Sequence, residues 1–167
     1  MIHIYSGDGK GKTTAAMGLA IRAAGRGKKV VIVQFMKGQD TGELRSLDRI
    51  PGITVLRYKQ NYGFFHTADE EKRLKMIAAN NSNLKEALAI PGDLLVLDEV
   101  FSAYALGAVD RGMIDDLVLG KQDKPELVLT GREPPQHIID AADYVSEIRK
   151  VKHPYDQGVN AREGIEY

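Results

Sequence analysis

A glycine-rich segment near the start of the chain constrains the fold more than any other feature. Residues 6–14 read Ser-Gly-Asp-Gly-Lys-Gly-Lys-Thr-Thr, with an apolar run before them at 2–5 and a helix-like stretch at 13–24. A strand, a glycine-rich loop containing Lys-Thr and a helix, in that order, are the context of a P-loop. We therefore predict that this segment binds the phosphates of ATP.

Each residue type in the loop has a physical role in this prediction. Gly7, Gly9 and Gly11 lack the Cβ that would keep backbone N–H groups away from phosphate oxygens. The helix N-terminus adds free donors, Lys12 adds a full positive charge, and the Thr13 hydroxyl is placed for Mg²⁺. The alternative is a flexible turn that binds no phosphate, which the agreement of strand, loop and helix disfavours. The predicted ATP-binding residues of the loop are Ser6, Gly7, Asp8, Gly9, Lys10, Gly11, Lys12, Thr13 and Thr14.

The rest of the chain alternates short apolar runs with helix-like stretches. The runs, rich in Val, Ile and Leu as strands buried on both faces are, lie at 2–5, 30–35, 53–56, 94–97, 127–129 and 144–148. The helical candidates lie at 13–24, 68–89, 110–119 and 134–141. This alternation predicts an α/β fold, a P-loop NTPase-like domain whose mostly parallel central sheet has about six strands and helices on both faces. We expect one domain over 1–167, with 152–167 as a C-terminal tail.

Two helix starts carry local signals. Thr67 is followed three residues later by Glu70, the spacing of a capping box, which predicts Thr67 as the N-cap of the helix at 68–89. Pro134 or Pro135 is expected in the first turn of the helix at 134–141, where proline is tolerated.

Composition excludes several classes of function. The chain has 23 Lys and Arg residues, 23 Asp and Glu residues and no Cys. The balanced charge gives no electrostatic reason to expect nucleic acid or an anionic membrane as the main partner. The lack of Cys rules out a thiolate nucleophile and a Cys-based zinc site. No apolar run is long enough to span a bilayer or to form a signal peptide, so we expect a cytoplasmic protein.

Two adjacent carboxylates end the apolar run at 94–97. Asp98 and Glu99 follow this run directly. In P-loop proteins an acid at a strand end beside the loop holds Mg²⁺, directly or through water, so Thr13, Asp98 and Glu99 form the predicted metal site. Adjacent residues of an extended strand point to opposite faces, so the two acids are expected to differ in role. A strand that merely ends in an acidic surface turn would look the same.

Two arginines are further candidates. Arg132 follows the run at 127–129, at the strand end where open α/β folds bind ligands, so it either contacts phosphate or lies in a surface turn. Arg22 lies nine residues after Thr13 on the expected helix, where a ligand role and a solvated position are equally compatible.

Aromatic residues gather in the irregular stretch before the helix at 68–89. Phe64 and Phe65 follow Gly63, and two tyrosines, Tyr58 and Tyr62, lie close by. Such residues either fold into the core or face a large flat ligand. The next residue is a histidine that could neighbour a helix cap, stack on a ligand or bind a metal. No protein nucleophile stands out, and no base beyond the acids of the metal site, so catalysis would rest on positioning and charge neutralisation.

Six segments taken together resemble the P-loop ATP:corrinoid adenosyltransferases, also called cob(I)alamin adenosyltransferases. They lie in the family's order at 6–16, 33–38, 63–67, 96–99, 129–132 and 151–167. The resemblance implies an enzyme that transfers the 5′-deoxyadenosyl group of ATP to the Co(I) centre of a corrinoid and releases triphosphate. The cobalt is then the nucleophile, in agreement with the lack of one in the chain. ATP is expected to lie reversed in the loop, with C5′ exposed to cobalt.

The resemblance also implies roles for single residues. Lys12, Glu99 and Arg132 are the expected catalytic residues, which with Mg²⁺ and Arg22 would stabilise the charge of the leaving triphosphate. Phe64, Phe65 and His66 are expected to bind the corrinoid on its lower face and to displace its lower ligand. His66 stands where relatives commonly have Trp, and its imidazole could stack on the corrin or coordinate cobalt.

The expected partners follow from the same resemblance. They are ATP and the corrinoid as substrates, a reduced flavoprotein as electron donor, and a second copy of the chain in a homodimer. Two other functions would use the same loop. One is a P-loop kinase or ATPase that transfers the γ-phosphoryl group, and the other is a non-enzymatic, nucleotide-gated corrinoid-binding module.

Overall fold

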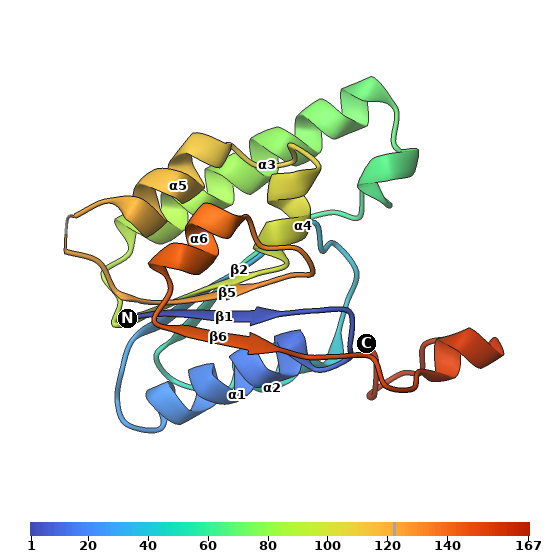
Figure 1. Cartoon of the computed structure of the whole chain (residues 1–167), viewed down its shortest axis with the longest axis horizontal. Coiled ribbons are helices and arrows are strands. Elements are labelled where there is room, and N and C mark those ends of the chain that lie inside the picture. The colour runs from blue at the N-terminus through green and yellow to red at the C-terminus, as the bar shows by residue number, and fades with distance from the viewer. Residues whose placement is uncertain (122) are drawn as a thin grey trace.

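Six parallel strands form the central sheet (Figure 1). The computed structural model describes residues 1–121 and 123–167. The strands are β1 (Ile2–Ser6), β2 (Val30–Gln34), β3 (Ile53–Leu56), β4 (Leu94–Asp98), β5 (Glu126–Thr130) and β6 (Tyr144–Glu147). They lie in the order β3-β2-β4-β5-β1-β6, and each neighbouring pair is parallel. The prediction of an α/β fold with a parallel sheet is confirmed.

Helices cover both faces of the sheet (Figure 1). In Figure 1, α1 and α2 lie below the sheet and the other four helices lie above it. They are α1 (Lys12–Ala24), α2 (Gly42–Leu47), α3 (Glu70–Ala89), α4 (Val100–Ala105), α5 (Arg111–Leu119) and α6 (Gln136–Ala141). Two short 3₁₀ helices complete the elements, η1 (Phe65–Thr67) and η2 (Pro154–Gln157). In the described part of the chain, no helix is both long and apolar enough to cross a bilayer.

Alternation along the strands produces two hydrophobic cores, one on each face. In β4, Leu94 and Val96 pack with the residues of α1, whereas Leu95 and Leu97 pack with those of α3 to α6. All residues of β2 and β4 are buried, as expected for central strands of a parallel sheet. This burial explains why these strands read as continuous apolar runs.

Two helix starts differ from the sequence prediction. The N-cap of α3 is Asp69, whose carboxylate accepts a hydrogen bond from the Lys72 amide at 2.8 Å. The prediction of Thr67 as the cap is wrong, because its hydroxyl donates instead to the carbonyl of Phe64, the residue before η1. An aspartate in the register of an N-cap competes well with an upstream threonine. Pro135 is the residue before α6 and not part of its first turn, since the helix begins at Gln136.

The sheet places four connections at one edge. Because the strands are parallel, the loops after β1, β2, β4 and β5 all leave at their carboxyl ends. Ligands of open α/β folds bind at this edge. The P-loop, the two acids and Arg132 are therefore brought to one side of the molecule.

Candidate active site

The P-loop connects β1 to α1 and packs against the chain that follows β6. The Gly9 amide donates to the Ile148 carbonyl at 2.7 Å. A Cβ on Gly7 or Gly9 would lie 2.5 or 2.7 Å from that same carbonyl oxygen, too close for any real contact. Gly11 has open space around it but a φ of 125°, which side chains with a Cβ rarely adopt. The loop glycines are thus required by neighbouring backbone and by conformation before any phosphate is considered.

Lys12 begins α1 and is turned into the loop. Its side chain is largely covered, the residue being 9% exposed, and its Nζ donates to the Gly9 carbonyl at 2.8 Å. Burial lowers the pKa of Lys12 below its ordinary value, and the positive charge of Arg132 acts in the same direction. A phosphate bound in the loop would favour the charged form of Lys12 and so act against both effects. Lys12 is therefore poised to exchange a carbonyl for an anion.

Asp98 is a completely buried carboxylate at the end of β4. It is 0% exposed, and its Oδ1 accepts from the Thr13 hydroxyl at 2.9 Å and from the Thr130 hydroxyl at 2.8 Å. Its Oδ2 accepts from Lys37 Nζ at 2.7 Å and from Gln34 Nε2 at 3.4 Å. Asp98 thus joins the ends of β2, β4 and β5 to the first turn of α1.

Glu99 takes a different direction from Asp98. Its φ of 60° is left-handed, so the strand ends at Asp98 and Glu99 begins the turn into α4. Its amide donates to the Thr130 hydroxyl at 2.9 Å, and its Oε2 accepts from the Ser102 hydroxyl at 2.8 Å. The two acids lie in different places because of this turn and not because of strand alternation, and their different roles stay a prediction. Glu99 lines the cavity, while Asp98 lies beneath it.

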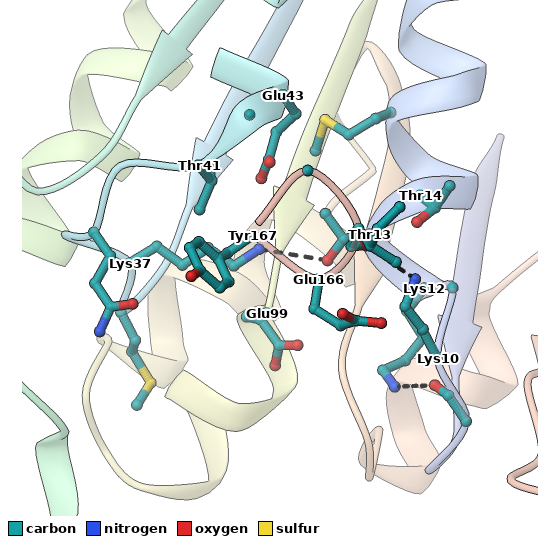
Figure 2. A pocket seen from close by; sticks show the side chains of 18 of the residues that line it. Lys10, Lys12, Thr13, Thr14, Lys37, Thr41, Glu43, Glu99, Glu166 and Tyr167 are labelled. Carbon is teal, nitrogen blue, oxygen red and sulfur yellow. Dashed lines mark hydrogen bonds between the residues drawn. The ribbon is translucent and has the colours of Figure 1, made fainter. Parts of the chain in front are cut away.

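One cavity of about 990 Å³ lies over the P-loop (Figure 2). Its walls come from the P-loop and α1, the loop after β2 together with α2, residues Gly63 and Phe64, the turn at Glu99, Arg132, and the tail. Tail residues 164–167 enter it, and Lys10 Nζ donates to the Ile165 carbonyl at 3.2 Å. Figure 2 shows Glu166 and Tyr167 among the loop residues Lys12 and Thr13.

Magnesium fits the part of the cavity beside Thr13 and Glu99 if the nucleotide supplies some of its ligands. Among residues 1–121 and 123–167, no three His, Asp or Glu side chains gather as a metal site of their own. Mg²⁺ at nucleotide sites is usually bound by one or two protein groups together with phosphate oxygens and waters. The Thr13 hydroxyl and the Glu99 carboxylate, both on the cavity wall, suit such a shared site.

The structure brings most of the predicted ATP-binding residues to the cavity, with three exceptions. The wall includes the loop from Asp8 to Thr14. Ser6 is buried at the end of β1, where its carbonyl accepts from the Ile148 amide, and Gly7 donates to the Arg132 carbonyl. Arg22 is exposed in the last turn of α1, outside the wall.

Asp8 links the loop to the chain after β6. Its Oδ1 accepts from the Lys150 amide at 2.9 Å, and this bond lowers the pKa of the exposed Asp8 carboxyl. The Asp8 side chain therefore positions the loop, while the residue itself lies on the cavity wall.

The aromatic stretch divides between surface and core. Phe64 is 66% exposed and stacks with His66 at 5.6 Å between ring centroids, and it lines the cavity. Phe65 is 8% exposed and packs in the core, with the Arg73 guanidinium 5.8 Å from its ring centroid. A ligand in the cavity would therefore meet Phe64 in this conformation, while Phe65 supports the stretch from below.

Several wall residues were missed from sequence. They are Lys37, Thr41 and Glu43 from the segment after β2, and tail residues 164–167. Thr41 has a buried hydroxyl with no hydrogen-bond partner among the described residues. Lys37 lies in one of the family-like segments, which was a usable signal, whereas nothing local marks Thr41 or Glu43.

Comparisons with known proteins agree with this geometry. The family model described as ATP:corrinoid adenosyltransferase BtuR/CobO/CobP matches residues 1–167. Corrinoid adenosyltransferase CobA of Salmonella typhimurium is 36% identical over 168 residues, covering 100% of this chain and 85% of that protein. The corrinoid adenosyltransferase of Escherichia coli K12 is 37% identical over 174 residues, with the same two coverages of 100% and 85%. That of Pseudomonas aeruginosa is 35% identical over 167 residues, covering 98% of this chain and 82% of the relative.

The family match and the relatives that align over this chain coincide with a P-loop and an exposed aromatic residue on one cavity, and with a buried strand-end acid beneath it. The chain therefore belongs to the ATP:corrinoid adenosyltransferase family.

Proposed function

We propose that this protein transfers the 5′-deoxyadenosyl group of ATP to the Co(I) centre of a corrinoid and releases triphosphate. One observation carries the proposal beyond the family match. A single cavity is lined by the phosphate loop and by the exposed ring of Phe64. A phosphate-binding floor and an aromatic rim suit a nucleotide and a large flat cosubstrate bound together.

The chemistry needs no nucleophile from the protein. The electron pair of Co(I) forms the cobalt–carbon bond at C5′, the C5′–O5′ bond breaks, and its electrons leave on the triphosphate. Lys10, Lys12 and Arg132 line the cavity and supply positive charge for this leaving group. Lys12 must first exchange the Gly9 carbonyl for a phosphate oxygen. A reversed ATP, with its phosphates in the loop and C5′ toward Phe64, would satisfy these demands.

Magnesium binding by Thr13 and Glu99 is the second part of the proposal. The ion would supply positive charge at the phosphates. Asp98 would act from beneath, since its hydrogen bond to the Thr13 hydroxyl turns the oxygen lone pairs of Thr13 toward the cavity. Glu99 is held by the Ser102 hydroxyl and reaches the same wall.

Other partners rest on chemistry or on the family alone. Co(I) is formed by one-electron reduction of Co(II), so a donor such as a reduced flavoprotein is required. A homodimer and a cytoplasmic location are expected from the family resemblance and from the use of ATP. Light scattering of the purified chain would test the dimer.

An anaerobic assay with ATP and a Co(I) corrinoid tests the activity. Adenosylcorrinoid formation, followed in the visible spectrum, should require Lys12, so Lys12→Ala should abolish turnover. Lys85→Ala, an exposed lysine of α3 outside the cavity, is the matched control and should retain full activity. Corrinoid binding without turnover in the unmodified protein would refute the enzyme and favour a binding module.

A further inference from the structure

An ion pair lies beside the threonine of the proposed magnesium site. Lys37 Nζ is 2.7 Å from Asp98 Oδ2 and 3.4 Å from the Thr13 hydroxyl oxygen. The Thr13 hydroxyl donates its proton to Asp98, so the face of its oxygen toward Lys37 accepts. A positive charge of the protein itself therefore already lies against the hydroxyl that would bind the metal ion.

The backbone after β2 adopts an unusual conformation to present this lysine. Met36 has a φ of 59°, a left-handed conformation that is uncommon for residues with a side chain and is found most often near functional sites. Lys37 follows directly, and Figure 2 shows its side chain extending across the cavity toward Thr13. The side chain is 26% exposed, so its ammonium group has room to move within the cavity that it lines.

The Lys37 ammonium group and a divalent ion would compete for the same place beside the Thr13 hydroxyl. Two cations a few ångströms apart at a partly buried site repel strongly, because little water screens them. Asp98 would keep hydrogen bonds from Thr13, Thr130 and Gln34 if Lys37 left, so the buried carboxylate would stay in place. The cavity that Lys37 would enter is the one that would hold the triphosphate.

We propose that Lys37 is a cation gate on the metal site. In the nucleotide-free protein its ammonium group holds Asp98 and Thr13 and excludes divalent ions. When the metal ion arrives with the nucleotide, Lys37 gives up this place and binds the phosphates as a second lysine beside Lys12. The metal ion thus enters only in company with the leaving group that it must neutralise. This inference rests on the proposed magnesium site.

The test measures binding of Mn²⁺, a probe for Mg²⁺, by electron paramagnetic resonance without nucleotide. Lys37→Gln removes the charge but keeps an N–H donor for Asp98, which protects the fold. We expect it to bind Mn²⁺ at least about tenfold more tightly than the unmodified protein. Lys37→Arg keeps the charge and should bind as weakly as the unmodified protein. Lys85→Gln removes an exposed lysine of α3 outside the cavity and is the control for net charge.

A second measurement uses inorganic tripolyphosphate with Mn²⁺, followed by calorimetry. Lys37→Gln should bind this pair roughly tenfold more weakly, because a phosphate contact is lost. Opposite signs in the two measurements are the signature of a gate, whereas a merely structural lysine would weaken both. Unchanged Mn²⁺ affinity in Lys37→Gln would overturn the gate alone. If neither the unmodified protein nor any variant binds Mn²⁺, even with tripolyphosphate, the metal site and the gate are both wrong. The assay for adenosylcorrinoid formation would still decide on adenosyl transfer.

Discussion

Replacing Asp98 with asparagine tests whether the buried carboxylate organises the site. The amide oxygen can still accept from Thr13 and Thr130, but the amide nitrogen would face Lys37 Nζ and Gln34 Nε2, so donor would meet donor. A hydrogen bond to a charged group contributes about 1.5–3 kcal/mol. Lys37 is partly exposed and can turn to water, which places the loss near the lower end, at about 2 kcal/mol.

Chemical denaturation and thermal melting would measure this loss. For a chain of this length, 2 kcal/mol corresponds to a fall in Tm of roughly 4–8 °C. The sharper test is a double-mutant cycle with Lys37→Met, which removes the donor to Asp98 Oδ2 altogether. Because the lost contact is shared, Asp98→Asn should cost about 1–2 kcal/mol less when Lys37 has already been replaced. An equal cost in both backgrounds, or a cost below about 0.5 kcal/mol in the unmodified protein, would refute the assignment of Asp98 as the anchor of Lys37.

Three further predictions concern the loop and the aromatic stretch. Phe64→Ala should raise the KM for the corrinoid and change the free energy of unfolding by less than about 0.5 kcal/mol. Phe65→Ala should lower the free energy of unfolding by roughly 3 kcal/mol, because that ring is buried. A larger loss of stability in Phe64→Ala than in Phe65→Ala, measured by denaturant unfolding, would contradict the assignment of Phe64 to the cavity rim and Phe65 to the core. Gly9→Ala should destabilise the protein by about 1–3 kcal/mol, since the new Cβ would lie 2.7 Å from the Ile148 carbonyl oxygen, and unchanged urea midpoints would show that this packing is absent. ATP affinity should fall as pH rises through the lowered pKa of free Lys12, because bound phosphate favours the protonated amine. Calorimetry in buffers of different ionisation enthalpy should show that ATP binding takes up protons in this pH range. Lys12→Arg should remove this proton uptake.

The strands and the P-loop could be predicted from sequence because their signals are local. Each strand is a short apolar run, and each of the six runs became a strand of the sheet. The short helices α2 and α4 were missed, since six residues are too few for helical periodicity to show. The cap of α3 was misplaced because Thr67 and Asp69 both suit an N-cap, and only the fold selects between them.

The site was harder to predict where distant segments meet. Gly7 and Gly9 looked necessary for phosphate, yet the structure shows backbone from Ile148 packed against them, some 140 residues away in sequence. The different positions of Asp98 and Glu99 depend on a left-handed turn at Glu99, which neither residue type predicts. Lys37 reaches Thr13 after a similar left-handed turn at Met36, and no local pattern reveals it.

The identity of the phosphate product tests the central claim most directly. Purified protein would be supplied with ATP, Mg²⁺ and a chemically reduced Co(I) corrinoid under anaerobic conditions, and the products would be followed by ³¹P NMR and by the visible spectrum. We expect one triphosphate for each adenosylcorrinoid formed, with no corrinoid-dependent ADP. Corrinoid-dependent release of ADP and phosphate, without a new cobalt–carbon bond, would contradict adenosyl transfer and indicate γ-phosphoryl chemistry in the same loop.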